Sequence, residues 1–380
     1  MRVRAATVEE NMSPTSPLLS RHGAVPDGRA DAGIAAHYGD PAREQRALER
    51  GRAVVDQGNR GVVTVSGPDR LSWLHTLSSQ QLTDLPAGVT TETLLLSVQG
   101  RIEFDLLVTD DGERTWLLTD VGQHEDLARW LDSMRFMLRV EVADVTGDWA
   151  AIGAAVDPED APAPLREASV RFADPWPRLG PGGFAYTVGE DHPAATWRWS
   201  VFLVPRTDLE RTVDALGEVG IGLAGNGAAE ALRIAAWRPR YAHDVDEKTI
   251  PHELDLLRTG VHLAKGCYKG QETIARVHNL GHPPRRLVFL HLDGSEHTLP
   301  AAGSEVRTGD RAVGRVTSVA QHGEMGPIAL AVIKRSVDPA ADLVVVDGES
   351  RYAAAQEVIV APDAGQVVGR PAGLLNTRRG

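Results

Sequence analysis

Residues 61–77 read GVVTVSGPDRLSWLHTL, and within them the spacing of the apolar residues changes from that of a β-strand to that of an α-helix. The three valines between Gly61 and Gly67 predict a short apolar strand, and Pro68 suits the first turn of a helix. Three leucines then recur at near-helical spacing from Leu71 onward, so we expect a helix to about Ser79. A short helix, AREQRALERG, is predicted before this stretch and ends at Gly51, so the alternation of strand and helix begins at Gly61.

The segments that follow continue the alternation of strand and helix. The apolar runs TLLLSVQ, IEFDLLVT and RTWLLT predict three strands, and Asp110-Asp111-Gly112 signals a hairpin turn before the last of them. Apolar residues between Leu127 and Met134 mark an amphipathic helix, and RVEVADV predicts a closing strand. The order of strand, helix, strands, helix and strand is typical of a ferredoxin-like α+β layer.

Two further units complete the predicted fold, which is of the α+β class. AAIGAAV and RWSVFLVP predict strands, and two helices follow them, so we expect a second α+β domain. From Arg285 the pattern changes to short strands with Gly, Asp and Pro turns, which predicts a small β-barrel. The predicted organisation is a flexible N-terminal arm, two α+β domains, the barrel and a flexible tail, at residues 1–33, 34–149, 150–284, 285–361 and 362–380.

The composition and net charge of the chain argue against several classes of function. The net charge of −12 argues against broad binding to nucleic acid, which needs a surplus of lysine and arginine. The basic clusters Arg238-Pro239-Arg240 and Arg285-Arg286 are expected in solvated loops. No apolar run approaches the roughly 18 residues of a membrane helix, and no secretory signal follows the first arginines, whether Met1 or Met12 is the true start. With a single cysteine, which leaves no internal disulfide, these features favour the cytoplasm.

The segment KGCYKGQETIARV, Lys265 to Val277, holds that cysteine, Cys267. Nearby cations and a helix N-terminus both lower the pKa of a thiol and make it reactive. Lys265 and Lys269 lie two residues to either side of Cys267, and a helix is expected to open at Gly270. Residue spacing leaves a reactive thiolate and a buried structural cysteine open as alternatives. The flanking sequence offers no pattern for a nucleophilic cysteine–histidine pair.

A longer pattern surrounds this segment. LRIAAWRPRYAHDVDEKTIPHELDL and VHLAKGCYKGQETIARVHNLGHPPRRL resemble the folate-binding YgfZ family, part of the superfamily of the aminomethyltransferase (T-protein) of the glycine-cleavage system. SGPDRLSWLHTLSSQQLTDLPAG, LLLSVQGRIEFDLLV and VGRVTSVA resemble other motifs of the superfamily, so the similarity covers about Gly33 to Val360. The KGCYxGQE signature of the family is complete here as Lys265, Gly266, Cys267, Tyr268, Gly270, Gln271 and Glu272.

The resemblance implies a ring of three domains around a central pocket that binds tetrahydrofolate or a derivative. It implies an accessory role in the assembly or repair of iron–sulfur enzymes, with Cys267 as the functional thiol and Lys265 as its catalytic neighbour. The implied partners are folate and iron–sulfur client or assembly proteins, without nucleic acid or membrane. A folate-dependent one-carbon (aminomethyl) transferase is the alternative function, and an interaction module with a structural cysteine is the third.

Two departures from the superfamily pattern bear on this choice. Aminomethyltransferases carry adjacent acidic residues, one of which acts near the folate nitrogens, whereas this chain reads Glu103-Phe104-Asp105. Asp105 is the best match to the acidic residue that acts near the folate nitrogens. Phe104 interrupts the acidic pair, which argues against methylene transfer. The LRIEAG of the superfamily becomes LRIAAW, so Ala235 replaces a carboxylate that could bind the pterin, and Trp237 is expected in the core or at a hinge.

A tetrahydrofolate pocket needs apolar walls, a carboxylate for the pterin edge and a cation for the glutamate tail. The candidates are Asp105 and Glu253 for the pterin edge, Arg233 or Arg240 for the tail, and Tyr241 as a packing surface. No metal site is predicted, because the scattered histidines between His278 and His297 lack carboxylates at ligand spacing.

Overall fold

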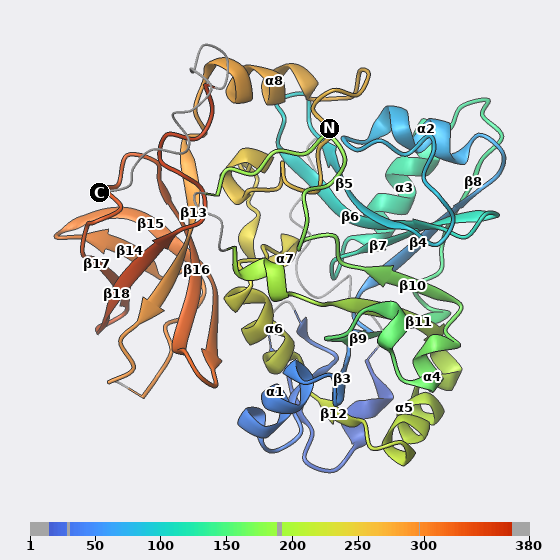
Figure 1. The fold of residues 1–380 in the computed structure, drawn as a ribbon, viewed down its shortest axis with the longest axis horizontal. Helices are drawn as coiled ribbons and strands as arrows, with labels where there is room; N and C mark the ends of the chain where they lie inside the picture. Colours follow the sequence, from blue (N-terminus) through green and yellow to red (C-terminus); the bar gives the residue numbers. More distant parts are fainter. Residues whose placement is uncertain (1–14, 29–30, 188–191, 296, 367–380) are drawn as a thin grey trace.

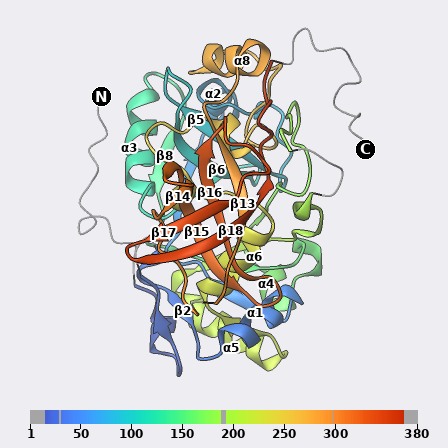
Figure 2. The ribbon, with the colours of Figure 1, turned by 90° about the vertical axis from the view of Figure 1, so that its left-hand side faces the viewer.

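The computed structural model describes residues 15–28, 31–187, 192–295 and 297–366. It contains two bodies built on five-stranded sheets and a closed barrel that lies beside them (Figure 1). Figure 2 shows the molecule from the barrel side, with α8 (Gln271–Leu280) above the barrel strands. The predicted α+β class with a terminal barrel is thus confirmed. Within the described ranges, no helix combines the length and the apolar character needed to cross a membrane.

The first body is an antiparallel sheet with strand order β5-β6-β7-β4-β8. Its core forms where Leu74, Leu127 and Leu131 of the two helices pack against Val63 and Val65 of β4. The arrangement confirms the order of strand, helix, strands, helix and strand. The elements are β4 (Gly61–Ser66), α2 (Arg70–Leu77), β5 (Thr90–Leu96), β6 (Ile102–Asp110), β7 (Arg114–Thr119), α3 (His124–Met134) and β8 (Glu141–Asp144).

The second body is a sheet with strand order β10-β11-β9-β3-β12, in which only the pair β12–β3 is parallel. Strand β3 lies in the segment assigned to the first domain, so sheet pairing crosses the boundary predicted at residue 149. All four residues of β3 are buried, as expected for a strand inside a sheet. Its sequence therefore lacks the alternation of apolar and polar residues by which a strand with one exposed face is recognised. The elements are α1 (Pro41–Glu49), β3 (Ala53–Asp56), β9 (Trp149–Ala154), α4 (Ala163–Arg166), β10 (Val170–Ala173), β11 (Ser200–Pro205), α5 (Leu209–Glu218), β12 (Gly222–Ala224) and α6 (Asn226–Ala235).

Part of the predicted N-terminal arm packs on this second body. Leu18 follows a capping serine, Ser16, and is completely buried among Val54, Ile152 and Phe202. Strand β1 (Val25–Pro26) pairs with β2 (Ala35–His37). The expectation of a flexible arm is therefore wrong for the described part of the arm. The sequence did not show this, because one buried leucine in a Pro- and Ser-rich segment creates no periodic pattern of apolar residues. Residues 1–14, and most of the predicted tail, lie outside the described residues.

The third body is a closed six-stranded barrel in the order β13-β16-β15-β14-β17-β18. Val288, Leu290 and Leu292 alternate along β13 and fill its interior with Val306 and Val345. The predicted barrel, from Arg285 onward, is confirmed. Its strands are β13 (Arg285–Leu292), β14 (Glu305–Thr308), β15 (Arg311–His322), β16 (Gly326–Lys334), β17 (Leu343–Asp347) and β18 (Ser350–Val358).

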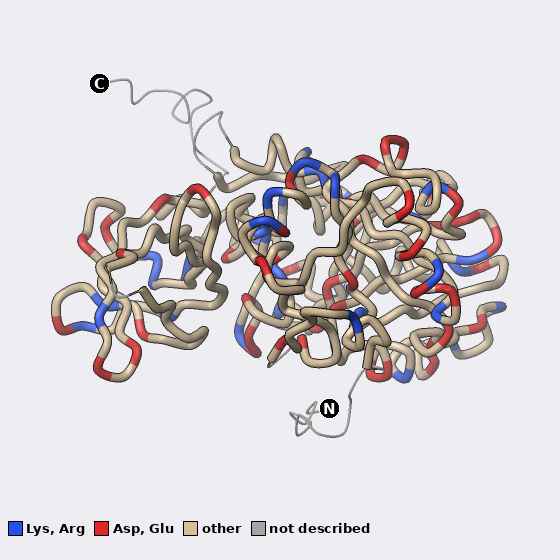
Figure 3. Tube along the Cα trace, turned by 90° about the horizontal axis from the view of Figure 1, so that it is seen from below, with Lys and Arg blue, Asp and Glu red and all other residues tan. Residues whose placement is uncertain are grey.

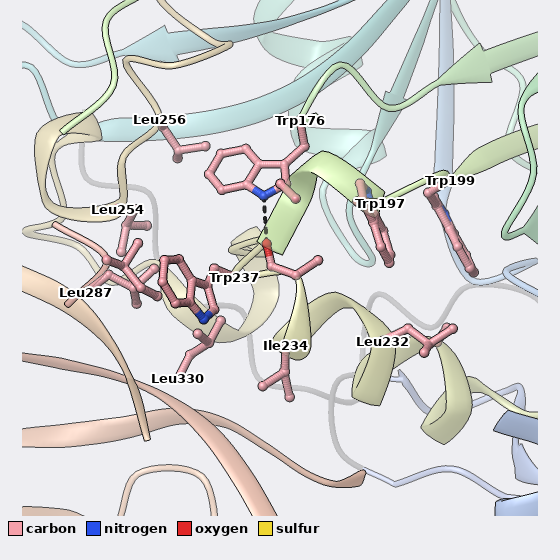
Figure 4. Close-up of a cluster of buried hydrophobic side chains, with 14 of the residues drawn as sticks. Trp176, Trp197, Trp199, Leu232, Ile234, Trp237, Leu254, Leu256, Leu287 and Leu330 are labelled. Carbon is pink, nitrogen blue, oxygen red and sulfur yellow. Dashed lines mark hydrogen bonds between the residues drawn. The ribbon is translucent and has the colours of Figure 1, made fainter. Parts of the chain in front are cut away.

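A tryptophan-rich core joins the three bodies behind α6 (Figure 4). Trp176 is fully buried and donates its indole N–H to the carbonyl of Ala236 at 3.0 Å. Trp237 packs beside Leu287 and Leu330 of the barrel, in the core position expected for it. Its φ of +56° lies in the left-handed region that favours glycine, so the packing of the indole holds the backbone there against strain.

Charged residues of both signs are interspersed along the described trace (Figure 3). Several arginines lie inside the protein instead. Arg238, Arg240 and Arg286 are each less than a tenth exposed, so the prediction of solvated basic loops is wrong for these three residues. The first two are neutralised by carboxylates from distant segments, which a local sequence window does not show.

An ion pair fastens the start of the barrel to the second α+β segment. Glu253 is fully buried in a 3-10 helix (Pro251–Leu254) and accepts two hydrogen bonds from Arg285, at 2.9 and 2.7 Å. Arg285 also pairs with Asp246 at 2.6 Å. These carboxylates and hydrogen bonds raise the pKa of Arg285.

Replacing Glu253 should loosen this junction. We expect Glu253→Gln to lower the free energy of unfolding by about 2 kcal/mol, because charge-assisted hydrogen bonds are lost at a buried carboxylate. Glu305→Gln, which removes an exposed pair with Arg307, should change it by less than about 0.5 kcal/mol. Urea unfolding of both variants measures the difference, and equal values would contradict this role of Glu253.

Candidate functional site

A cavity of about 90 Å³ lies where the two sheets meet the connection between α6 and α7 (Tyr241–Asp244). Four of the five predicted folate-binding residues line it: Asp105, Arg233, Arg240 and Tyr241. The fifth, Glu253, does not line it and serves the ion pair with Arg285. The structure thus brings together predicted residues from β6, α6 and α7 that are far apart in the chain.

Strand β6 places Asp105 on the cavity side. Residues on a strand alternate between its faces, and along β6 Ile102, Phe104 and Leu106 are buried while the intervening residues are partly buried. Phe104 packs against Trp130 of α3, on the helical face of the sheet. Phe104 therefore faces away from the cavity, and of the two acidic residues beside it only Asp105 lines the cavity.

Asp105 lies beside a buried carboxylate that the sequence analysis missed. Glu92 is completely buried, and the pairing of Leu94 with Asp105 and of Glu92 with Leu107 makes Glu92 and Asp105 diagonal neighbours on one face. Glu92 accepts a hydrogen bond from the hydroxyl of Thr259. Glu92 lies among threonines just before the apolar run of β5, so the local sequence gave little sign of its burial, and a buried carboxylate requires a partner.

That partner is Arg238. Its Nη2 lies 2.6 Å from Oε1 of Glu92, and its Nε lies 3.1 Å from Oδ2 of Asp174. The guanidinium also stacks over the ring of Trp176, with 5.1 Å between its central carbon and the ring centroid. Asp174 is held in turn by the indole N–H of Trp197 at 3.0 Å. One buried cation thus serves two carboxylates and leaves Asp105 without a close ion pair in the described residues.

This environment favours the neutral form of Asp105. Burial raises the pKa of Asp105 well above its usual range, and the charge of Glu92 raises it further. The guanidinium of Arg238 lowers it by less. A carboxyl group with a raised pKa inside a cavity can donate a hydrogen bond or a proton, a property typical of functional sites.

The two arginines proposed for the glutamate tail are already neutralised. Arg240 makes two-pronged ion pairs with Asp31 and Asp120, at 2.7 and 2.8 Å. Arg233 binds Glu230 at 2.6 Å and Asp244 at 3.1 Å. The structure brings both guanidinium groups to the cavity wall, but it directs their donors into these pairs.

A group with metal-ligand atoms lies beside Arg240. One ligand atom from each of Asp31, Glu230 and His243 falls within 4.8 Å of the others. Arg240 donates to Asp31 and Glu230, so a guanidinium already neutralises these carboxylates. The arrangement therefore acts as an ion-pair cluster that joins α6 and α7 to the N-terminal segment.

Aromatic and aliphatic side chains form the remaining wall of the cavity. Trp197 and Trp199 stack with 5.4 Å between ring centroids and 10° between planes (Figure 4). Leu107, Leu118 and Tyr241 also line the space. Burial and nearby carboxylates raise the pKa of Tyr241 to about 12, so its hydroxyl stays protonated. The sequence WRW in front of an apolar strand was the signal for the stacked pair, since alternate residues share a face.

The KGCYKGQE segment lies elsewhere, against the first sheet, and no residue from 265 to 272 lines the cavity. Lys265 is buried, and its ammonium donates to the carbonyls of His75, Ser78 and Gln80 at the end of α2. Burial lowers the pKa of Lys265 to about 8, while three carbonyl acceptors favour its charged form. Lys265 thus acts as a C-terminal cap of α2 in the structure.

Most of the other motif residues also support the loop. Lys269 pairs with Glu103 at 2.9 Å, and Tyr268 is buried under the ammonium of Lys265. The side chain of Gln271 donates to the carbonyl of Lys265 at 3.3 Å. Both flanking lysines are therefore directed to partners other than the thiol, so the structure does not support the activation that their spacing suggested.

Cys267 itself is exposed, and with it Gly266 and Glu272. Helix α8 begins at Gln271 with Gly270 as its N-cap, so Cys267 precedes the helix by several residues and is not its cap. The structure excludes the alternative of a buried structural cysteine. It presents the thiol to solvent on a loop whose neighbouring side chains are fixed.

Comparisons with known proteins agree with this architecture. Residues 20–155 match the family model described as the GCVT N-terminal domain. The chain is 25% identical over 307 residues to the aminomethyltransferase of Symbiobacterium thermophilum, which covers 74% of this chain and 78% of that protein. It is 28% identical over 306 residues to the aminomethyltransferase of Thermus thermophilus, with 74% and 79% covered.

The fold matches a solved structure, the glycine cleavage system aminomethyltransferase T from Bartonella henselae, with a TM-score of 0.70. The match covers 92% of this chain and 96% of the other at 18% identity. The protein thus shares the fold of that structure. It is similar in sequence to aminomethyltransferases over about three quarters of its length.

Two glycines in the motif segment should differ sharply in their tolerance to substitution. Gly270 has a φ of +89°, and an added Cβ would lie 2.6 Å from the carbonyl oxygen of Ser97, so Gly270→Ala should cost about 1–3 kcal/mol of stability. Gly266 has open space around it, and Gly266→Ala should change stability by less than about 0.5 kcal/mol. Thermal unfolding checks both, and a neutral Gly270→Ala would refute this packing of the loop.

Proposed function

We propose that this protein binds the pterin end of a tetrahydrofolate in the cavity beside Asp105 and acts in folate-dependent one-carbon (aminomethyl) transfer. The observation that carries the proposal is the position of Asp105 at the wall of a cavity lined by aromatic rings, where burial raises the pKa of its carboxyl group. The sequence similarity to aminomethyltransferases supports the class of reaction. It favours transfer chemistry over the accessory role that the motif resemblance had placed first.

The residues of the cavity fit one end of a folate. Trp197 and Trp199 offer flat apolar surface, and the carboxyl groups of Asp105 and Glu92 offer acceptors and a donor for ring nitrogens. A cavity of about 90 Å³ is smaller than the roughly 300–1,000 Å³ of sites that enclose a whole drug-sized ligand. The paired arginines leave little attraction for carboxylates there, so the glutamate tail would extend away from the cavity.

Asp105 would serve as the proton-holding group of the reaction. Formation of the methylene bridge makes two N–C bonds on tetrahydrofolate and breaks the two bonds that join the donor carbon to its carrier group and to its nitrogen. The two N–H protons of tetrahydrofolate pass to these two leaving groups, and the nitrogen leaves readily only when it is protonated. A neutral carboxyl group in a water-poor cavity can supply this proton and, once ionised, can stabilise positive charge on a ring nitrogen. Arg238 would hold Glu92 in place throughout, because both are buried and paired.

Changing Asp105 tests this proposal. We expect Asp105→Asn to abolish formation of 5,10-methylenetetrahydrofolate from tetrahydrofolate and an aminomethyl donor, and to weaken tetrahydrofolate binding at least tenfold. Glu103→Gln is the matched control, since Glu103 lies two residues away on β6 but pairs with Lys269 outside the cavity. Isothermal titration and a coupled absorbance assay give the two readouts. Wild-type protein that neither binds tetrahydrofolate nor forms product would refute the function.

A second candidate function rests on the exposed thiol. We infer from the KGCYxGQE resemblance that the protein acts as a folate-binding accessory factor of the YgfZ type for iron–sulfur enzymes, with Cys267 meeting client or assembly proteins. The supporting observation is the solvent-exposed thiol on a loop anchored by Lys265 and Tyr268. In this candidate the cavity and the thiol have separate tasks.

A complementation experiment separates the two candidates. If the accessory role holds, Cys267→Ala should fail to restore iron–sulfur enzyme activities in a deletion strain under oxidative stress, while the purified variant binds tetrahydrofolate normally. Gly266→Ala, a neighbouring change in open space, should restore them. Full restoration by Cys267→Ala would contradict the thiol's role and leave the transferase proposal standing.

A further inference from the structure

Three carboxyl groups and one guanidinium meet at the wall of the cavity. Glu92, Asp105 and Asp174 come from three different segments, and Arg238 is the cation that they surround. The geometry of Arg238 commits its Nη2 to Glu92 and its Nε to Asp174. Asp105 is left with the carboxyl group of Glu92 as its diagonal neighbour on the same face of the sheet.

Two neighbouring carboxylates on one face of a buried strand pair repel each other strongly when both are ionised. Glu92 makes the ion pair with Arg238 and accepts a hydrogen bond from Thr259, whereas Asp105 makes no ion pair among the described residues. The proton therefore belongs to the pair but resides mainly on Asp105. The same cluster explains why a fully buried glutamate is stable in β5.

We propose that Glu92 is a positioning residue that keeps one proton on the Glu92–Asp105 pair, so that the cavity offers a carboxylic acid donor beside carboxylate acceptors. A ligand edge with a hydrogen-bond acceptor next to N–H donors, as in an amino-substituted reduced pterin, matches this arrangement. The inference rests on the proposed folate function and specifies which hydrogen-bond donors and acceptors the cavity offers to the pterin. The same role of Glu92 would keep Asp105 protonated, which is the state required for Asp105 to deliver a proton to a leaving nitrogen.

Other charged groups around the cavity modulate the same proton. They line the cavity with Asp105 from the turn before β4, the segment after β7, the segment after β10, α6, the connection from α6 to α7, and α7, and they are Arg60, Asp120, Asp174, Glu230, Arg233, Arg238, Arg240 and Tyr241. Asp120 and Glu230 are each paired with arginines, which keep their pKa values low and their charges fixed. Glu92 is therefore the neighbour whose removal changes Asp105 most directly.

The pH dependence of tetrahydrofolate binding tests the inference. Glu92→Gln removes the neighbouring charge and frees Arg238 to pair with Asp105, which should lower the pKa of Asp105 by at least about one unit. Binding that requires protonated Asp105 should then be lost at lower pH than in the wild type. We expect at least tenfold weaker binding at pH 7.5 and near wild-type binding at pH 5.5, measured by titration calorimetry.

The outcomes separate this inference from the proposed function. An unchanged pH midpoint in Glu92→Gln, or equal weakening at every pH, would overturn the inference, since a merely structural role has no pH signature. Glu92→Asp keeps the charge and should restore much of the wild-type profile. Wild-type protein that binds no tetrahydrofolate at any pH would instead overturn the proposed function.

A second measurement does not depend on the fold of Glu92→Gln. The infrared difference spectrum between the wild-type protein and Asp105→Asn at pH 7 should contain the carbonyl stretch of one protonated carboxyl group, because other buried carboxyl groups with raised pKa values, such as Asp56 and Asp255, contribute equally to both spectra. Absence of that band from the difference spectrum would contradict a proton held on Asp105.

Discussion

The buried charge of Arg238 is the constraint around which the candidate site is organised. A guanidinium inside a protein is stable only where carboxylates and rings compensate for the water it has lost. Here Glu92 comes from the first sheet, Asp174 from the second, and Trp176 packs under the cation. Satisfying one arginine therefore brings both sheets to the connection between α6 and α7, and the cavity lies where they meet.

The remaining arginines at the wall have an architectural role. Arg240 joins Asp31 of the N-terminal segment to Asp120 beyond β7, and Arg233 reaches Ser318 in the barrel at 2.7 Å. Their charges are cancelled, so the cavity attracts a ligand through hydrogen bonds and ring stacking more than through net charge. The exposed Cys267, which does not line the cavity, leaves room for a second task at the surface.

Local patterns predicted the elements well, and long-range pairing explains what they missed. The valines of β4, the leucines of α2 and the short strands after Arg285 each carry a periodic signal, and the structure confirms them. The strand period of two already implied that Glu103 and Asp105 share a face and that Phe104 faces the helices. By contrast, no local window shows that Arg238 meets Glu92, or that Lys265 caps α2, because those partners come from distant segments.

The central claim is that a neutral Asp105 meets the pterin end of tetrahydrofolate in the cavity. A crystal structure of the protein with bound tetrahydrofolate tests it most directly. The account predicts the pterin ring against Trp197 or Trp199, with a ring nitrogen within hydrogen-bond distance of the carboxyl group of Asp105. A pterin bound away from the cavity, or one that leaves Asp105 without a contact, would contradict it.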